Sequence, residues 1–192
     1  VSKYVVRETV RLIRLGDRPI EVLHNPVDST EFSPRTGAEV SGRVLFVGDA
    51  GDEKGGRGLL SAFPIVAAAI PEAHLVLVGR DTRDSKTRGS YIANRRDELP
   101  TSIVSRVEFA GQLDHDDVAT QLARAEVCVF PSRAESFGIA WVEAMSMEKA
   151  CVVSSTGPGP EILEHERSGL HADPSSSTDI AAALIRLLAD PL

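Results

Sequence analysis

Short apolar segments alternate along most of this chain with longer segments whose apolar residues recur at helical spacing. The apolar segments are nearly continuous and rich in β-branched residues, which is typical of strands buried on both faces. We expect strands at 44–47, 74–78, 107–110, 126–130 and 150–154, and helices at 56–69, 85–98, 115–124, 138–147, 159–164 and 178–189. This strict alternation predicts an α/β domain whose parallel sheet is covered by helices on both faces.

The first 35 residues differ from the rest of the chain. Residues 2–15 have an amphipathic helical pattern, and a segment rich in turn residues follows it up to a polar stretch at 35–42. We therefore expect residues 1–35 to be the end of a missing N-terminal domain together with an interdomain connector. Residues 36–192 are expected to form one domain, with no second domain downstream.

Charge and cysteine content exclude several classes of protein. The net charge of -7 argues against a broad basic face for nucleic acid. No apolar run approaches the roughly 18 residues that a membrane-spanning helix needs, so any membrane association would come through the missing domain. Cys128 and Cys151 lie in apolar runs, which predicts buried thiols and a reducing, cytoplasmic environment.

Glycine follows three of the expected strands, at Gly48, Gly79 and Gly111. In an open parallel sheet, ligands bind beyond the carboxyl ends of the strands, where a side chain would obstruct close approach. Each glycine by itself is also explained by a tight turn. Three together favour a ligand crevice at this edge of the sheet.

The loop after the first strand, residues 48–58, is rich in glycine and precedes a helix. It lacks both the Walker lysine pattern and the G-x-G-x-x-G dinucleotide fingerprint. Lys54 nevertheless lies beside a helix N-terminus, and both could face a diphosphate. A solvated loop lysine is the alternative.

Residues 131–145 carry two acids eight positions apart, Glu135 and Glu143. Gly138 opens an apolar helix here, so the amides at 137–139 are expected to form a first turn that could receive phosphate or sugar hydroxyls. A carboxylate inside an apolar helix is costly unless it has a partner, and its two oxygens suit a vicinal diol. The alternative is a helix-start acid at Glu135 and a solvent-facing Glu143.

Another acidic segment, Asp114 to Asp117, resembles a D-x-D metal site. It directly precedes the helical pattern at 115–124, where acids cap a helix and complement its dipole. The histidines show no spacing typical of metal ligands. Helix capping is therefore favoured over metal binding.

The motifs together resemble a known enzyme family. The chain reads strand-Gly, EKG, strand-Gly, strand-Gly, PSRAESFGIAWVEAM, GPGPEIL and SGLHADP, and HNPVDSTEF is similar to an interdomain connector. This order resembles the C-terminal, donor-binding half of retaining glycosyltransferases of the GT-B fold, specifically glycosyltransferase family 4. The resemblance implies a Rossmann-like domain of a hexosyltransferase-type enzyme that uses a nucleotide-diphosphate sugar and needs neither a metal nor another cofactor.

The resemblance also implies roles for individual residues. Glu135 would lie against the donor sugar hydroxyls, Glu143 would hold the ribose, and Lys54 would neutralise the leaving diphosphate. Gly48 and Gly111 would allow close approach of the ligand, with Gly111 near the base. The turn amides that approach the sugar and the diphosphate would be those of Ser136, Phe137, Gly138 and Ile139.

One departure from the family pattern bears on activity. The family usually has Gly-Arg where this chain has Gly48 and Asp49, so a carboxylate stands where a cation is expected. Arg57 or Arg80 could substitute for that cation. The departure leaves open a second function, a nucleotide-sugar-binding module without catalysis. For the transferase, the acceptor, which the sequence does not identify, would be held by the missing N-terminal domain, and the chain alone would be inactive.

Overall fold

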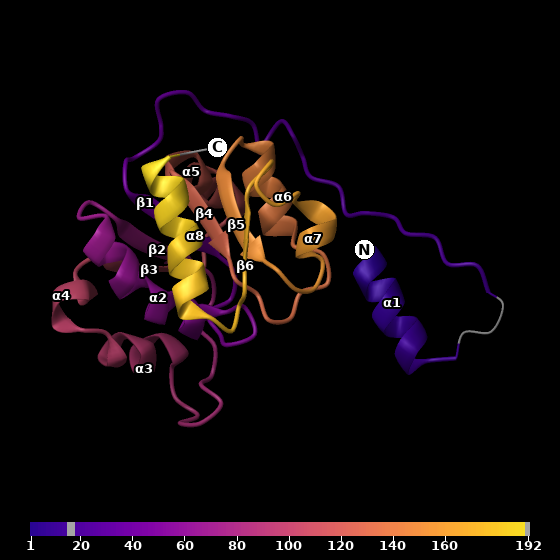
Figure 1. Cartoon of the computed structure of the whole chain (residues 1–192), viewed down its shortest axis with the longest axis horizontal. Helices are drawn as coiled ribbons and strands as arrows, with labels where there is room; N and C mark the ends of the chain where they lie inside the picture. Colours follow the sequence, from indigo (N-terminus) through magenta and orange to yellow (C-terminus); the bar gives the residue numbers. More distant parts are fainter. Residues whose placement is uncertain (15–17, 191–192) are drawn as a thin grey trace.

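The structure, a computed structural model, describes residues 1–14 and 18–190. At its centre lies a six-stranded parallel sheet with the strand order β3-β2-β1-β4-β5-β6 (Figure 1). The strands are β1 (Arg43–Val47), β2 (His74–Val78), β3 (Val107–Gly111), β4 (Val127–Phe130), β5 (Ala150–Ser154) and β6 (Leu170–Ala172).

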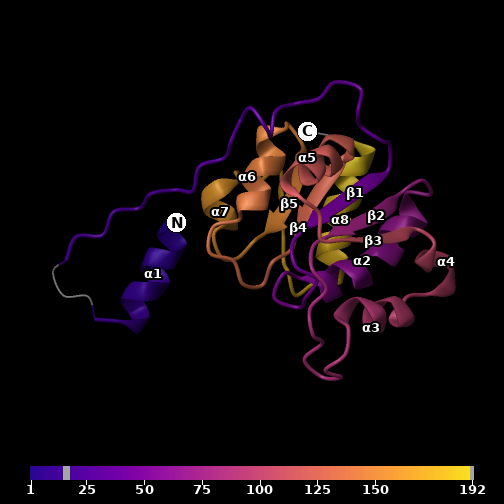
Figure 2. The same ribbon diagram turned by 180° about the vertical axis from the view of Figure 1, so that it is seen from behind.

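Helices cover both faces of this sheet, which confirms the predicted Rossmann-like α/β class. Figure 1 shows α8 in front of the strands, and Figure 2, seen from behind, shows α5 and α6 on the other face. The helices are α1 (Lys3–Leu12), α2 (Gly56–Ala69), α3 (Tyr91–Glu98), α4 (Thr101–Val104), α5 (His115–Arg124), α6 (Ile139–Ser146), α7 (Gly159–Ile162) and α8 (Ser177–Ala189).

The core has two layers because successive strand residues point to opposite faces. On β1, Val44 and Phe46 pack with the apolar residues of α2 and α8. Leu45, between them, packs with those of α5 and α6. Cys128 and Cys151 are adjacent on β4 and β5 and are buried free thiols, as the sequence predicts. The continuous apolar strands therefore serve both layers at once.

The helix expected at 85–98 is the main secondary-structure prediction that is wrong, because the helix begins only at Tyr91. The Asp84 carboxylate accepts hydrogen bonds from the amides of Lys86 and Thr87, at 2.9 and 3.0 Å, and so closes a turn. Arg88 has a φ of 63°, which a helix cannot accommodate. Helix α7 ends two residues before its expected end, and the short elements α4 and β6 were not predicted.

The upstream segment contacts the domain near one end of α1. Ser2 is the N-cap of α1 and donates a 2.6 Å hydrogen bond to the carbonyl oxygen of Ser136. The Glu161 carboxylate accepts from the amides of Lys3 and Tyr4, at 2.8 and 3.1 Å. The helix expected at 2–15 ends at Leu12, and residue 15 lies outside the described residues. Farther along, Phe32 is buried in the core on the α6 face.

Candidate functional site

The candidate site lies where the strand order reverses direction, between β1 and β4. The loop after β1 leads to α2 on one face of the sheet, whereas the loop after β4 leads to α6 on the other. Such a switch point leaves a crevice beyond the carboxyl ends of the strands. The two loops touch through their backbones, since a Cβ at Gly55 would lie 1.9 Å from the Pro131 carbonyl oxygen.

A cavity of about 240 Å³ opens at this switch point. It brings together seven of the nine site residues predicted from the sequence, which are Gly48, Lys54, Glu135, Ser136, Phe137, Gly138 and Ile139. Gly48 and Lys54 come from the loop after β1, and the other five come from the loop after β4 and the start of α6. Two segments far apart in the sequence therefore form one concave surface.

Lys54 and Glu135 are joined directly across the cavity. The Lys54 Nζ donates to Glu135 Oε2 at 2.7 Å, and the side chains are 34% and 15% exposed. The other oxygen, Glu135 Oε1, accepts from the amide of Ser136 at 2.9 Å. The lysine is thus not a free solvated side chain, and Glu135 is fixed at both of its oxygens.

The turn from Ser136 to Ile139 is shaped by Gly138. Gly138 has a φ of 91°, and a Cβ there would lie 2.4 Å from the indole ring of Trp141, so a larger residue would clash. Phe137 is buried, and the imidazole ring of His24 lies 5.4 Å from its ring. The glycine lets the backbone enter α6 while Trp141 packs beneath the turn.

Glu143 lies inside α6 and is only 7% exposed. Burial raises the pKa of its carboxyl group, an effect that the nearby charge of His115 opposes and that of Glu31 reinforces. Among the described residues, none donates a hydrogen bond to this carboxylate. Glu143 is therefore not on the solvent face, the alternative left open by its spacing.

Gly111 and Glu143 do not line the cavity. Gly111 ends β3, at the edge of the sheet and two strands from β1. Their predicted contacts with base and ribose remain predictions, because the cavity covers only the part of the site around Lys54 and Glu135.

The cations near the first loop are paired with acids. Arg80 donates two hydrogen bonds to Asp49, at 3.1 and 2.6 Å, and this bonding lowers the pKa of the Asp49 carboxyl group. Arg57 is 3.3 Å from Asp52. Arg80 therefore balances the charge of Asp49. Neither Arg57 nor Arg80, the two candidates to replace the family arginine at the diphosphate, lines the cavity.

Ser132 is a site residue that the sequence analysis did not single out. It lines the cavity, is 5% exposed, and its hydroxyl makes no hydrogen bond with any described residue. Its place directly after Pro131, at the end of an apolar strand, was the available signal. The other lining residues not predicted are Asn25, Phe46, Val47, Ala140 and Trp141.

The acidic segment at 114–117 lies at the start of α5. Asp114 is the N-cap residue but makes no side-chain capping hydrogen bond, while Asp116 and Asp117 lie in the first turn. The charge of Asp116 and Asp117 complements the helix dipole, as expected. The expected cap at Asp114 is not made by a side-chain hydrogen bond. Within residues 1–14 and 18–190, no group of three or more His, Cys, Asp or Glu side chains is placed to hold a metal ion. Over the same residues, every helix is too short or too polar to cross a membrane.

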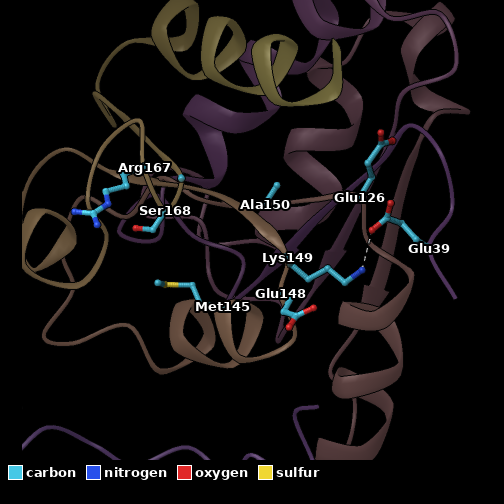
Figure 3. A pocket seen from close by; sticks show the side chains of 9 residues that line it. Glu39, Glu126, Met145, Glu148, Lys149, Ala150, Arg167 and Ser168 are labelled. Carbon is cyan, nitrogen blue, oxygen red and sulfur yellow. Dashed lines mark hydrogen bonds and ion pairs between the residues drawn. The ribbon is translucent and has the colours of Figure 1, made fainter. Parts of the chain in front are cut away.

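A larger cavity, of about 350 Å³, opens at the opposite edge of the sheet (Figure 3). It lies where β4 and β5 begin, next to Glu126 and Ala150. Lys149 at its rim is paired with Glu39 at 2.9 Å. Because parallel sheets bind ligands at the carboxyl ends of their strands, the smaller cavity is the better candidate site.

Comparison with known proteins identifies the family of the chain. A model of the family described as glycosyl transferases group 1 matches residues 41–190. The chain is 28% identical to a GDP-mannose-dependent monoacylated alpha-(1-6)-phosphatidylinositol monomannoside mannosyltransferase of Corynebacterium glutamicum, over 100% of this chain and 54% of that protein. It is 28% identical to glycogen synthase of Mycobacterium tuberculosis, over 96% of this chain and 43% of that protein. It thus spans about half the length of these relatives.

Solved structures show the same fold. Sucrose-phosphate synthase from Thermosynechococcus elongatus superposes with a TM-score of 0.79 at 28% identity, covering 100% of this chain and 48% of that one. The Anabaena protein HepE, solved in complex with UDP and glucose, superposes with a TM-score of 0.74 at 22% identity, covering 88% and 47%. Since the family model matches residues 41–190, well over half of this chain, the chain belongs to the glycosyl transferases group 1 family.

Proposed function

We propose that the chain is the donor-binding half of a retaining glycosyltransferase of family 4, which moves a sugar from a nucleotide-diphosphate sugar to an acceptor. The observation that carries the proposal is the meeting of Lys54, Glu135 and the turn at 136–139 in one cavity at the switch point. The relatives named for GDP-mannose and the HepE structure with UDP support a nucleotide-sugar donor without deciding its base.

In this proposal Lys54 acts on the leaving group. As the glycosidic bond breaks, negative charge develops on the diphosphate, and a fixed ammonium group in a partly enclosed site stabilises it. The amides at the start of α6 and the positive end of its dipole face the same charge. Lysine and helix amides together would perform the neutralisation without a metal ion.

The two acids have separate roles. Glu135 would accept hydrogen bonds from the donor sugar, exchanging its contact with Lys54 for sugar hydroxyls when the donor binds. Glu143 would accept from the ribose diol, and its burial without a protein partner supports a ligand role. Gly111, at the end of β3, would lie on the side of the base.

The acceptor would be held by a preceding N-terminal domain. The chain matches only about half the length of its relatives, and transfer needs donor and acceptor held together with water excluded. We therefore expect residues 1–192 alone to bind nucleotide without transferring sugar. The free thiols of Cys128 and Cys151 support a reducing compartment such as the cytoplasm.

The test is a thermal-denaturation screen of this chain against UDP-, GDP- and ADP-sugars. A ligand at 100 times its dissociation constant adds about 2.7 kcal/mol of stability, so one nucleotide class should raise the Tm clearly. Lys54→Met should abolish that increase, while the surface change Lys86→Met should leave it intact. No increase with any nucleotide sugar would refute the donor site.

A catalytically inactive binding module is the second candidate, favoured by Asp49. Because Arg80 neutralises Asp49, this carboxylate is a weaker obstacle to a diphosphate than the sequence suggests. Sugar transfer by the full-length parent, assayed beside donor binding, separates the two functions. Tight donor binding without turnover on any acceptor would favour the module.

A further inference from the structure

Tyr91, outside the cavity, contacts the loop that carries Lys54. It is the first residue of α3 and is 3% exposed. Its Oη donates a 2.6 Å hydrogen bond to Asp52 Oδ1, and its amide donates to the carbonyl oxygen of Thr82 at 2.9 Å. The ring thus connects the segment after β2 with the loop after β1.

Asp52 is two residues before Lys54 and organises the turn around it. The Asp52 carbonyl oxygen accepts from the amide of Gly55 at 3.1 Å, which closes a turn with Lys54 inside. Its carboxylate also accepts from Arg57 Nε at 3.3 Å, at the start of α2. The position of Asp52 therefore determines where the Lys54 side chain leaves the backbone.

The other side of the turn is held by the second loop of the site. The carbonyl oxygen of Glu53 accepts from the amides of Arg133 and Ala134, at 2.8 and 3.1 Å. Lys54 is thus flanked by a side-chain anchor at Asp52 and a backbone anchor at Glu53. Only the first of these anchors depends on a side chain. Asp52, Lys54 and Tyr91 also line a neighbouring cavity of about 340 Å³.

Tyr91 is itself rigidly supported. The guanidinium group of Arg95 lies 5.4 Å from the centre of its ring, and Arg95 Nη2 donates to Asp84 Oδ2 at 3.0 Å. Arg95 and Asp84 are both buried, at 4% and 1% exposure. A buried and hydrogen-bonded ion pair holds the ring in place, so the hydroxyl presents a fixed donor to Asp52.

We infer that Tyr91 is a positioning residue for Lys54, acting through Asp52. The inference rests on the proposed role of Lys54 toward the diphosphate. Lysine has a long, flexible side chain, and a charge on such a chain stabilises a phosphate most when its starting point is fixed. Without the hydroxyl, the turn at 52–55 gains freedom, and phosphate binding must restrict it again.

The first arm of the test measures the loop without any ligand. In Tyr91→Phe, hydrogen exchange of the amides at 49–56 should be faster than in the parent chain, while strand β4 should be unchanged. Tyr4→Phe is the matched control, because it removes a tyrosine hydroxyl from α1, a different element. Unchanged exchange at 49–56 in Tyr91→Phe would overturn the inference, whatever Lys54 does.

The second arm measures affinity for inorganic pyrophosphate by calorimetry. Loss of one hydrogen bond predicts roughly two- to tenfold weaker binding in Tyr91→Phe, and no further loss when Tyr91→Phe is added to Lys54→Met. An equal loss in both backgrounds, or none in Tyr91→Phe alone, would overturn the inference. Unchanged affinity in Lys54→Met would instead refute the proposed role of Lys54, and with it the positioning role.

Discussion

At the scale of single residues, Glu143 makes the stability of the fold depend on pH. Burial raises the pKa of its carboxyl group, so the folded chain binds this proton more tightly than the unfolded chain. The free energy of unfolding therefore decreases as pH rises from the ordinary carboxyl pKa through the raised one. The side chain of Glu143→Gln is neutral at every pH, so the free energy of unfolding of this variant does not decrease in this way. We expect it to be more stable than the parent at about pH 7.5 and similar at about pH 4, by urea unfolding.

Glu72→Gln, at an exposed position, is the control and should show no such divergence with pH. If the proposed ribose contact is right, the same Glu143→Gln variant should bind whichever nucleoside diphosphate the parent chain binds more weakly, by roughly 1 to 3 kcal/mol, since an amide replaces one acceptor oxygen of the carboxylate by a donor. A variant less stable than the parent at both pH values would mean that the ionised carboxylate has a favourable partner in the fold.

The ion pair between Lys54 and Glu135 makes a different prediction. Glu135 is bonded to the Lys54 ammonium group that a diphosphate would contact in the proposed function. Glu135→Gln should therefore increase affinity for pyrophosphate about two- to fivefold, in keeping with the modest energy of partly exposed pairs. If the proposed function is right, Glu135→Gln should also reduce sugar transfer by the full-length protein, because the proposed contact with the donor sugar is weakened.

Glu166→Gln is a matched control for that change. It removes the same charge from an exposed pair of the same length, 2.7 Å, between Glu166 and Arg186 and away from the cavity. If both variants raised pyrophosphate affinity equally, net charge rather than the release of Lys54 would explain the effect.

The sequence singled out Lys54 and Glu135 but did not indicate that they form a pair. Lys54 and Glu135 are 81 positions apart, and no local pattern shows that two such side chains meet. Likewise, the sequence named Asp49 and Arg80 separately but not their bidentate contact. Pairing depends on the order of the strands, which periodicity does not encode.

At the scale of elements, prediction succeeded where packing and local propensity agree. Helix α2 has the expected bounds, because its apolar residues recur with helical period against the sheet. The failure at residues 85–90 has a local cause, since Asp84 bonds the following amides and competes with helix formation. Strand β6 has only three residues, one of them His171, too few to give a strand pattern.

The junction of the turn at 136–139 with α6 allows a test at this scale. Gly138→Ala places a Cβ against the Trp141 ring at a positive φ, which should cost about 1 to 2 kcal/mol in backbone strain and about 1 to 3 kcal/mol in overpacking. Gly37→Ala is the control, because Gly37 has a φ of 74° with nothing near its Cβ position. Unfolding by urea should show a clearly larger loss at Gly138. Equal losses would mean that Trp141 moves aside freely.

At the scale of the whole molecule, the strand order brings together the two loops that line the candidate site. The alternation of strands and helices predicted a parallel sheet but not its strand order. In the observed order, β3-β2-β1-β4-β5-β6, β1 and β4 are neighbours. Their loops then leave toward opposite faces and form the cavity that Lys54 and Glu135 line. Gly111 ends the edge strand β3 and does not line this cavity, and its predicted contact with the base stays a prediction.

Residues upstream of position 36 contribute to the core of the domain. The sequence places the start of the domain at residue 36, yet Phe32 is 2% exposed in the core, and its carbonyl oxygen accepts from Ser146 Oγ at 2.8 Å. A chain of residues 26–192 should retain this packing, whereas residues 36–192 should be less stable by about 3 to 5 kcal/mol, the usual cost of losing a buried phenylalanine. Urea unfolding of both chains measures the difference, and Phe32→Ala in the 192-residue chain should reproduce most of it. Equal stability of the two truncated chains would show that Phe32 contributes little to the core and that the folding unit begins at residue 36.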